Sequence, residues 1–312
     1  MAIAVVTGGA GFIGSNLATA LLERGDQVRI VDNFTTGRRV NLSAIAGQVE
    51  VFEGDIRDRA LLDRAMVGAQ YVLHQAALPS VARSVQDPEA SHDVNVNGTL
   101  NVLQAARKAG VQRVVYAASS SAYGETPVLP KVETMAPQPI SPYGATKLFG
   151  EQYGQVWNRV YGLEFVALRY FNVFGRHQAP DSEYAAVIPR WVTLMQRGLQ
   201  PKIFGDGGQT RDFCYIDNVI EANLKALSAP AAPGNVYNVA CGERVSLLDV
   251  VAAINAGLGT QLEPEFLPPR AGDIRDSLAD IGAARRDLGY TASVRFAEGL
   301  QRAMAWYAAH PS

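Results

Sequence analysis

The chain has 312 residues, 48% of them hydrophobic, which is enough to bury a sizeable core in one large domain or two moderate ones. Its formal net charge of -2, without any run of Lys or Arg, argues against nucleic acid as a partner, and no apolar stretch reaches the roughly 20 residues of a membrane-spanning helix. Only two cysteines are present and the first residues lack the features of a signal peptide, so we expect a cytoplasmic protein with reduced thiols, no disulfide framework and no metal site.

Short β-branched runs alternate with longer amphipathic segments through the first half of the chain, a pattern typical of βαβ units around a parallel sheet. Strands are expected at residues 3–7, 27–31, 49–52, 71–74, 113–117 and 164–169. Between the first two, apolar residues recur at helical spacing up to Gly25, a residue favoured just beyond a helix. Two further helices are expected around residues 98–109 and from Pro142 onward, because proline suits a first helical turn.

The regularity loosens after residue 169, where glycine- and proline-rich loops fall at 205–208 and 268–269. The sequence therefore predicts an α/β fold with a Rossmann-type, doubly wound parallel sheet and a smaller C-terminal α/β lobe. We expect the Rossmann domain to span residues 1–170, with segments near 210–240 returning to it. The second lobe would span residues 171–312.

A glycine-rich segment, residues 7–14, follows the first expected strand and opens the first expected helix. Its glycines let the backbone turn tightly and approach a pyrophosphate, whose charge the helix N-terminus meets. Asp32 ends the next strand, where a carboxylate would bind the adenosine ribose and repel a 2′-phosphate. The segment predicts dinucleotide binding, with NAD preferred to NADP. Arg38 and Arg39 follow closely enough to weaken that preference, but we interpret them as solvated loop charges.

Tyr143 and Lys147 are four residues apart and therefore share one face of a helix. An ammonium beside a phenol favours phenolate and would lower the tyrosine pKa from about 10 towards working pH, giving a usable general base. The alternative is a core Tyr beside a solvent-facing Lys. The dinucleotide motif upstream favours the catalytic interpretation.

Three serines, at positions 119–121, follow the fifth expected strand. At the carboxyl end of a parallel strand, hydroxyls point into the crevice where ligands bind in doubly wound folds. A polar exit from strand to loop is the simpler alternative. The three serines alone therefore do not indicate a ligand site, and their interpretation depends on the other motifs.

With these motifs in order, the chain resembles the extended branch of the short-chain dehydrogenase/reductase superfamily. Within it, the chain resembles the UDP-hexose 4-epimerases, and most closely the bacterial UDP-N-acetylglucosamine 4-epimerases. The similarity covers nearly the whole chain and is carried by the runs at 54–56, 75–77, 95–99, 117–121, 169–172, 184–189, 211–217 and 270–273.

The resemblance implies NAD as the cofactor and a UDP-sugar as the substrate, with Tyr143, Lys147 and Ser119 as the catalytic residues. The implied cofactor-binding residues are Gly8, Gly11, Phe12, Ile13, Gly14, Asp32, Asn33, Thr36, Gly37, Asp55, Ile56, Gln75, Ala76, Ala77, Asn95, Tyr143, Lys147 and Tyr170. The implied substrate-binding residues are Ser80, Ser119, Ser120, Ser121, Tyr143, Asn172, Ala186, Val187, Ile203, Phe204, Arg211, Arg270, Asp273 and Ser277. It also implies a homodimer joined by the helices near 97–109 and 142–160.

The implied reaction inverts C4 of a UDP-hexose through a transient 4-keto sugar, with NAD taking and returning the hydride. Related enzymes offer rival activities: epimerisation of a UDP-uronic acid, 4,6-dehydration and decarboxylation. Dehydratases carry an Asp-Glu pair where Ser120 and Ser121 stand, which disfavours dehydration here. A non-catalytic NAD-binding sensor is a further alternative, although such proteins have usually lost the Tyr or the Lys.

The preferred hexose is not evident from the sequence. Ser277 is small and occupies a position that flanks the sugar's 2-substituent in similar enzymes, which favours acceptance of an N-acetyl group alongside plain hexoses. Arg83 could meet a uronic acid, although a surface ion pair is the simpler interpretation.

Overall fold

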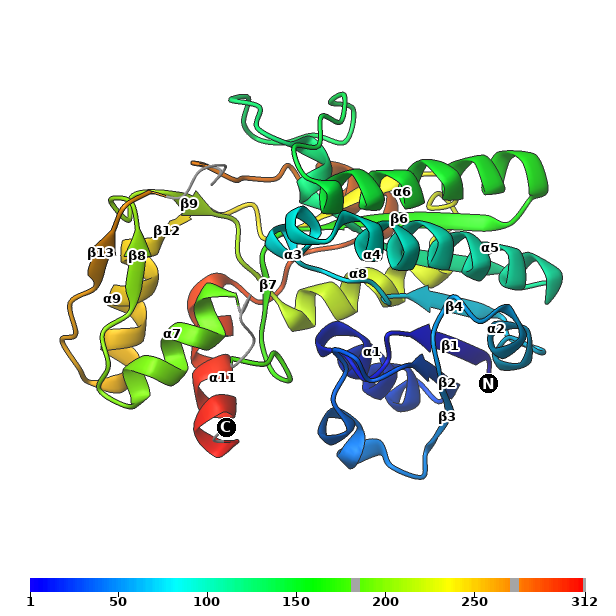
Figure 1. Cartoon of the computed structure of the whole chain (residues 1–312), viewed down its shortest axis with the longest axis horizontal. Helices are drawn as coiled ribbons and strands as arrows, with labels where there is room; N and C mark the ends of the chain where they lie inside the picture. Colours follow the sequence, from blue (N-terminus) through cyan, green and yellow to red (C-terminus); the bar gives the residue numbers. More distant parts are fainter. Residues whose placement is uncertain (181–185, 270–274, 311–312) are drawn as a thin grey trace.

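The computed structural model of the chain describes residues 1–180, 186–269 and 275–310. A parallel sheet of seven strands, in the order β11-β6-β5-β4-β1-β2-β3, forms its centre (Figure 1). The strands are β1 (Ile3–Thr7), β2 (Gln27–Asp32), β3 (Val49–Glu53), β4 (Tyr71–His74), β5 (Arg113–Ser119), β6 (Glu164–Tyr170) and β11 (Val236–Val239). The predicted Rossmann-type fold is confirmed. The chain order reverses beside β1, whose neighbours are β2 and β4, and ligands bind at such a switch point in doubly wound folds.

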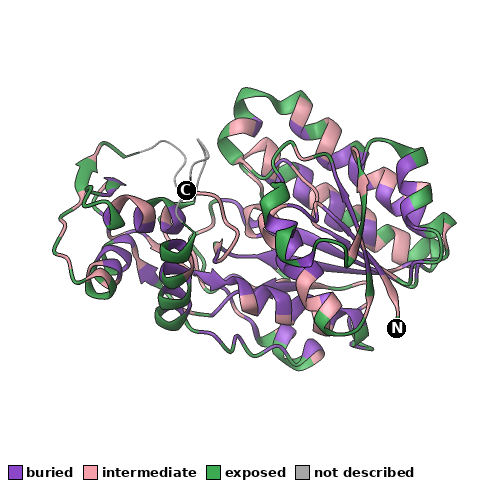
Figure 2. Ribbon diagram, turned by 90° about the horizontal axis from the view of Figure 1, so that it is seen from below, coloured by how far each residue is buried: buried purple, intermediate pink, exposed green. Residues whose placement is uncertain are grey.

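Helices cover both faces of the sheet. One layer contains α1 (Phe12–Glu23) and α8 (Ile216–Ser228), and the other contains α2 (Arg59–Ala65), α5 (Gly98–Lys108) and α6 (Pro142–Tyr161). Alternate residues of β1 serve the two layers, since Ala4 and Val6 pack in the first core and Val5 in the second. Figure 2 shows buried residues along the strands and the inner helix faces, with exposed residues outside.

The helices that flank the expected site begin and end for local reasons. Gly25, with φ of +90°, follows α1 in the left-handed region, which favours glycine. Helix α6 begins at Pro142, and the preceding Ser141 caps it by accepting a hydrogen bond from the Gly144 N–H at 3.0 Å. It ends at Gly162, whose φ is +70°.

Shorter helices lie between β4 and β5 or follow strands. They are α3 (Val81–Gln86), α4 (Pro88–His92), a π-helical turn (Asp93–Asn97) and the 3-10 turns Arg39–Ile45 and Ser120–Tyr123. Among the described residues, no helix is both long and apolar enough to cross a membrane.

A second group of elements stands apart from the sheet, around α7, α9 and α11 (Figure 1). Its helices are α7 (Val187–Gln196), α9 (Leu247–Leu258) and α11 (Phe296–Ala309), whereas α10 (Gly282–Leu288) packs against β11 and α8. Its short strands are β7 (Val173–Phe174), β8 (Lys202–Phe204), β9 (Thr210–Arg211), β10 (Cys214–Tyr215), β12 (Val245–Ser246) and β13 (Glu265–Leu267). They pair as β10 with β7, β12 with β9 and β13 with β8. From this later half of the chain, β11 and α8 return to the sheet, where β11 pairs with β6.

Candidate active site

Backbone hydrogen bonds hold the loop between β1 and α1 in a tight turn next to β2. The Gly8 N–H donates to the Val31 carbonyl at 2.8 Å, and the Gly11 N–H donates to the Gly8 carbonyl at 3.1 Å. A Cβ at Gly14 would lie 2.1 Å from the Gly8 oxygen, and one at Gly8 would lie 2.7 Å from the Ala76 nitrogen, so only glycine fits at either position. No described side chain caps the first turn of α1. Its N–H groups can therefore receive an anionic group such as a pyrophosphate.

Asp32 is the last residue of β2, and its carboxylate is hydrogen-bonded to this loop. One carboxylate oxygen accepts the Ala10 N–H at 2.9 Å and the other accepts the Phe34 N–H at 2.8 Å. Burial raises the pKa of Asp32, and these backbone hydrogen bonds partly offset the rise. The carboxylate thus joins the glycine-rich loop to the turn after β2, at the position predicted for ribose binding. Nearby Arg39 pairs with Glu53 at 2.7 Å.

The remaining predicted cofactor residues gather at the carboxyl ends of β1, β2, β3 and β4. Phe12 and Ile13 form the first turn of α1, Asn33, Thr36 and Gly37 follow β2, Asp55 and Ile56 follow β3, and Gln75, Ala76 and Ala77 follow β4. The Asn33 amide donates to the Asp55 carboxylate at 2.8 Å. Asn95 lies in the π-helical turn and accepts the Leu78 N–H at 2.8 Å.

Gln75 provides a test of whether this site suits a bound cofactor. Its Oε1 accepts a hydrogen bond from the Tyr170 hydroxyl at 3.3 Å, but its buried Nε2 has no hydrogen-bond partner among the described residues. A buried amide donor without a partner is costly, and a ligand with an acceptor group would remove that cost. Together with the open helix terminus and the glycine-rich loop, these residues fit a dinucleotide.

The predicted catalytic residues meet beside β5. Tyr143 is the second residue of α6, and Ser119 is the last residue of β5. Burial raises the pKa of Tyr143, and a hydrogen bond with Ser119 partly opposes the rise. Lys147 is buried, with its Nζ 4.7 Å from the centre of the Tyr116 ring, and burial lowers its pKa to about 7.

These shifts correct one expectation from the sequence. Lys147 was expected to lower the pKa of Tyr143, but in the chain by itself the phenol pKa is raised. Lys147 is buried and Tyr143 is half-buried, and desolvation of each side chain disfavours its charged form. In the chain by itself, the neutral phenol of Tyr143 is therefore favoured over the phenolate.

Four of the predicted substrate residues follow strands β4, β5 and β6 of the central sheet. Ser120 and Ser121 form the turn after β5, where the Ser121 N–H donates to the Ser119 hydroxyl at 3.1 Å. Ser80 caps α3 by accepting the Arg83 N–H at 3.1 Å. Asn172 has an unusual φ of +25°, and its side chain donates to the Asp212 carbonyl at 3.3 Å. A non-glycine residue with positive φ is often found at a functional site.

The remaining predicted substrate residues belong to the second group of elements. Ala186 and Val187 begin α7, and Ile203 and Phe204 end β8. Arg211 and Ser277 lie close together because Thr210, beside Arg211, accepts the Ser277 N–H at 3.1 Å. Arg270 and Asp273 fall outside the described residues.

Asp212 is a residue of this site that the sequence interpretation did not single out. Its buried carboxylate accepts the N–H groups of Cys241 at 2.9 Å, Gly242 at 3.1 Å and Ala279 at 3.1 Å. Burial raises its pKa to about 6. By tying these segments together, Asp212 fixes the segment that contains Ser277 next to Arg211.

An ion pair between α6 and the sheet was also missed. Arg169 on β6 donates through Nε and Nη2 to the two carboxylate oxygens of Glu151 on α6, at 2.9 Å and 2.6 Å. Both side chains are buried, so the bidentate pair holds α6 against the sheet. A signal was present, since Glu151 stands one helical turn after Lys147 and Arg169 lies in an expected core strand.

Known proteins are similar to this chain in both sequence and architecture. Residues 4–240 match the NAD dependent epimerase/dehydratase family. The UDP-glucose 4-epimerase of Mycolicibacterium smegmatis is 39% identical over 307 residues, or 97% of each chain. The UDP-glucose 4-epimerase of Thermotoga maritima, solved with UDP-glucose, has a TM-score of 0.95 at 36% identity and covers 99% of this chain and 100% of its own. The UDP-N-acetylglucosamine 4-epimerase of Methanobrevibacter ruminantium, in complex with UDP-N-acetylmuramic acid, has a TM-score of 0.92 at 35% identity, over 99% and 98%.

Proposed function

The chain belongs to the NAD dependent epimerase/dehydratase family, and we propose that it works there as a UDP-sugar 4-epimerase. The observation that carries the proposal is the meeting of Tyr143, hydrogen-bonded to Ser119, with buried Lys147 one helical turn away. The glycine-rich loop, Asp32 and Gln75 supply the cofactor side of the same site. Its similarity to enzymes with this activity extends over the whole chain.

Tyr143 is the general base of the proposed reaction. It takes the proton from the sugar 4-hydroxyl and returns it after the sugar has presented its other face, and Ser119 aligns both hydroxyls. Proton transfer by a positioned group of this kind contributes about 10²- to 10⁴-fold. Lys147, when protonated, stabilises the phenolate. Bound NAD supplies the acceptor and donor for the C4 hydride, so that the substrate passes through a 4-keto sugar without net oxidation.

The chain's own residues divide the work of binding. We assign the cofactor to residues 1–170 together with the returning segments α8 and β11, and the UDP-sugar to the rest of 171–312. We assign Arg211 to the diphosphate, because a guanidinium suits phosphate oxygens. Ser120 and Ser121, in place of an acidic pair, leave no extra acid or base beside Ser119 to drive loss of water from the sugar.

We further propose that both plain and N-acetylated UDP-hexoses are substrates. Ser277 is half-buried beside β9, and we assign it to the sugar's 2-substituent because similar enzymes carry the residue that flanks this group at the same position. Ser277→Tyr should lower kcat/KM for UDP-GlcNAc at least tenfold more than for UDP-Glc, because steric exclusion acts only on the larger substituent. Equal loss on both substrates, or no acetylated turnover by the parent protein, would favour an epimerase of plain hexoses.

A homodimer joined by α5 and α6 is part of the proposal. The rings of Phe149, Tyr153, Trp157 and Tyr161 lie in series along α6, with centroids 4.3, 5.2 and 4.9 Å apart. The first two pairs are stacked and the last pair is edge-on. Nearby, Val156 and Val160 are 48% and 62% exposed. An uncovered apolar face of this length favours a protein partner.

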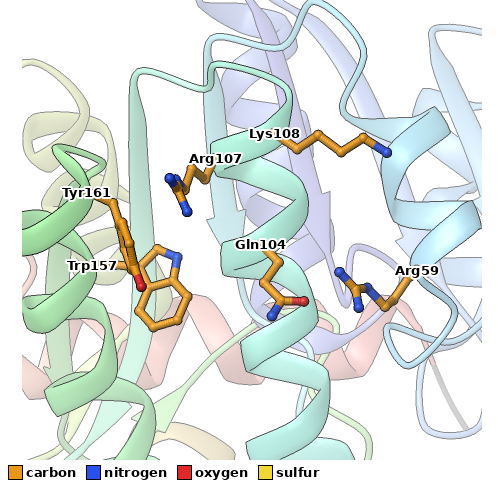
Figure 3. A pocket seen from close by; sticks show the side chains of 6 residues that line it. All are labelled: Arg59, Gln104, Arg107, Lys108, Trp157 and Tyr161. Atoms are coloured by element: carbon orange, nitrogen blue, oxygen red, sulfur yellow. The ribbon is translucent and has the colours of Figure 1, made fainter.

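A surface hollow bounded by α5, α6 and the start of α2 supports that assembly. It is lined by Arg59, Gln104, Arg107, Lys108, Trp157 and Tyr161 (Figure 3). The Trp157 Nε1 and the Gln104 Oε1 are buried there without a hydrogen-bond partner among the described residues. A second copy of the chain could supply those partners.

A cytoplasmic location also remains part of the proposal, supported by the free thiols of Cys214 and Cys241.

The activity is tested by incubating the purified protein with UDP-Glc and, separately, with UDP-GlcNAc, and identifying the products by proton NMR. We expect UDP-Gal and UDP-GalNAc to form until each pair reaches equilibrium. A product lacking the C6 hydroxyl would indicate a dehydratase. Absence of any turnover, with NAD bound, would indicate a sensor.

A further inference from the structure

Ser84, on helix α3, is hydrogen-bonded to the backbone of Tyr143. The Tyr143 N–H donates to the Ser84 Oγ at 3.0 Å, and the Ser84 hydroxyl itself donates to the Val81 carbonyl at 2.7 Å. We propose that Ser84 is a positioning residue that fixes the backbone of Tyr143 and thereby holds its phenol at Ser119. This inference rests on the proposed function, in which Tyr143 is the base.

The bond fills a need that α6 cannot meet alone. The first N–H groups of a helix have no partner within the helix. Pro142 has no N–H, and the Gly144 N–H is taken by Ser141. The Tyr143 N–H therefore requires an acceptor from another element, and Ser84 provides it.

The geometry of Ser84 makes that acceptor well directed. A serine hydroxyl has one proton to donate, and here the Val81 carbonyl receives it. The oxygen is thus oriented with its lone pairs available to the Tyr143 N–H. Ser84 is completely buried, so water cannot replace the bond if the hydroxyl is removed.

Ser84 also links Tyr143 to the predicted substrate contact at Ser80. Ser80 caps the same short helix, one turn before Ser84. Tyr143 is then held at two points. Ser119 contacts its hydroxyl and Ser84 accepts its backbone N–H. Loss of the second anchor would leave binding largely intact but would misalign the proton transfer, to which rate is very sensitive.

Ser91 offers a matched control. It lies in α4, which also packs against α6, and it is 1% exposed. Its Oγ has no hydrogen-bond partner among the described residues. Ser91→Ala therefore removes the same atom from an equally buried position near the same helix, without breaking a bond to Tyr143.

The experiment compares the full-length parent with Ser84→Ala, Ser84→Thr and Ser91→Ala. Steady-state kinetics with UDP-Glc should show kcat lowered about tenfold or more in Ser84→Ala, with KM within about threefold and bound NAD unchanged. The Tyr143 amide should exchange its hydrogen at least tenfold faster in that variant, as measured by NMR. Ser84→Thr, which keeps the hydroxyl, should recover most of both properties, and Ser91→Ala should match the parent.

Two results would overturn the proposal. One is a Ser84→Ala variant whose Tyr143 amide exchanges like that of the parent. The other is a Ser84→Ala variant that keeps the kcat of the parent, or a Ser91→Ala variant that loses as much kcat as Ser84→Ala. An equal loss in both variants would mean that kcat responds to packing around α6 and not to the hydrogen bond. The exchange measurement needs no turnover, so it decides whether Ser84 anchors Tyr143 even if the parent proves inactive on every UDP-sugar and the proposed function fails.

Discussion

Tyr143 and Lys147 share a helical turn, and burial acts on both. It raises the pKa of the phenol and lowers that of the ammonium to about 7. In each case the neutral form gains, because a poorly hydrated environment disfavours charge of either sign. In the cofactor-free chain, the uncharged forms of both side chains are therefore favoured. A cationic ligand, or a hydrogen bond from the substrate, would shift the protonation of Tyr143 towards the phenolate.

The lowered pKa of Lys147 makes a prediction about stability. Below about pH 7 the lysine is protonated in both the folded and the unfolded chain, whereas above it only the unfolded chain keeps the proton, up to about pH 10.4. The unfolded state then binds more protons, so the free energy of unfolding should rise with pH by about 1.4 kcal/mol per unit relative to a variant without the amine.

Denaturant unfolding of cofactor-free parent and Lys147→Met, from pH 6 to pH 9, measures this difference. We expect it to be flat below pH 6.5 and to rise above pH 7.5. Lys202→Met, which removes an exposed amine paired with Glu265, should show no such rise. Parallel pH profiles for the two variants would contradict the assigned burial of charge at Lys147.

At the scale of elements, the glycine-rich loop depends on Asp32 for more than a ligand contact. The carboxylate already holds the Ala10 and Phe34 N–H groups, so it shapes the loop before any cofactor arrives. Removing it should both loosen the turn between β1 and α1 and eliminate the predicted ribose contact.

Asp32→Ala should therefore reduce the NAD retained by purified protein at least tenfold, as measured by mass spectrometry of the heat-denatured sample. Asp26→Ala is a suitable control, since Asp26 also accepts a backbone N–H, from Ala2, but lies before β2 rather than after it. Undiminished NAD in Asp32→Ala, or NADP as the only bound dinucleotide, would count against the assignment.

The sequence predicted those elements whose signal is local. The six predicted strands begin where expected, and four of them extend one or two residues further. Strand β11 was not predicted because completely buried Asn238 interrupts its apolar pattern, and Asn238 is bonded to the distant Lys131 and Asp280 carbonyls. The pairing of β8 with β13 joins residues about sixty positions apart, which no local period reports.

The candidate site divides in the same way. Tyr143 and Lys147 could be identified because four-residue spacing places them on one helix face. The partners of Tyr143 could not, since Ser84 is a single serine without a motif and its bond spans 59 positions. The sign of the Tyr143 pKa shift also required the burial that only the folded chain defines.

At the scale of the whole molecule, the proposed dimer interface lies along α5 and α6, where Val156 and Val160 are exposed beside the row of aromatic rings on α6. Light scattering should give a mass twice the 33.5 kDa of the chain at micromolar concentration. Val160→Glu should shift the mass towards that of one chain, because a carboxylate buried at an apolar interface is unfavourable. Val40 is equally exposed, at 62%, but belongs to the turn after β2, so Val40→Glu should stay dimeric. A monomeric parent, or dimers in both variants, would refute this interface.

The most direct test of the epimerase assignment is to convert UDP-glucose that carries deuterium at C4 and follow the label by NMR and mass spectrometry. If the sugar is oxidised and reduced at C4 within one site, the UDP-galactose formed should keep its deuterium at C4, NAD should show no net reduction, and Tyr143→Phe should lose nearly all of this turnover. Loss of the label to solvent, a deoxygenated product, or a Tyr143→Phe variant with most of the parent kcat would contradict the account.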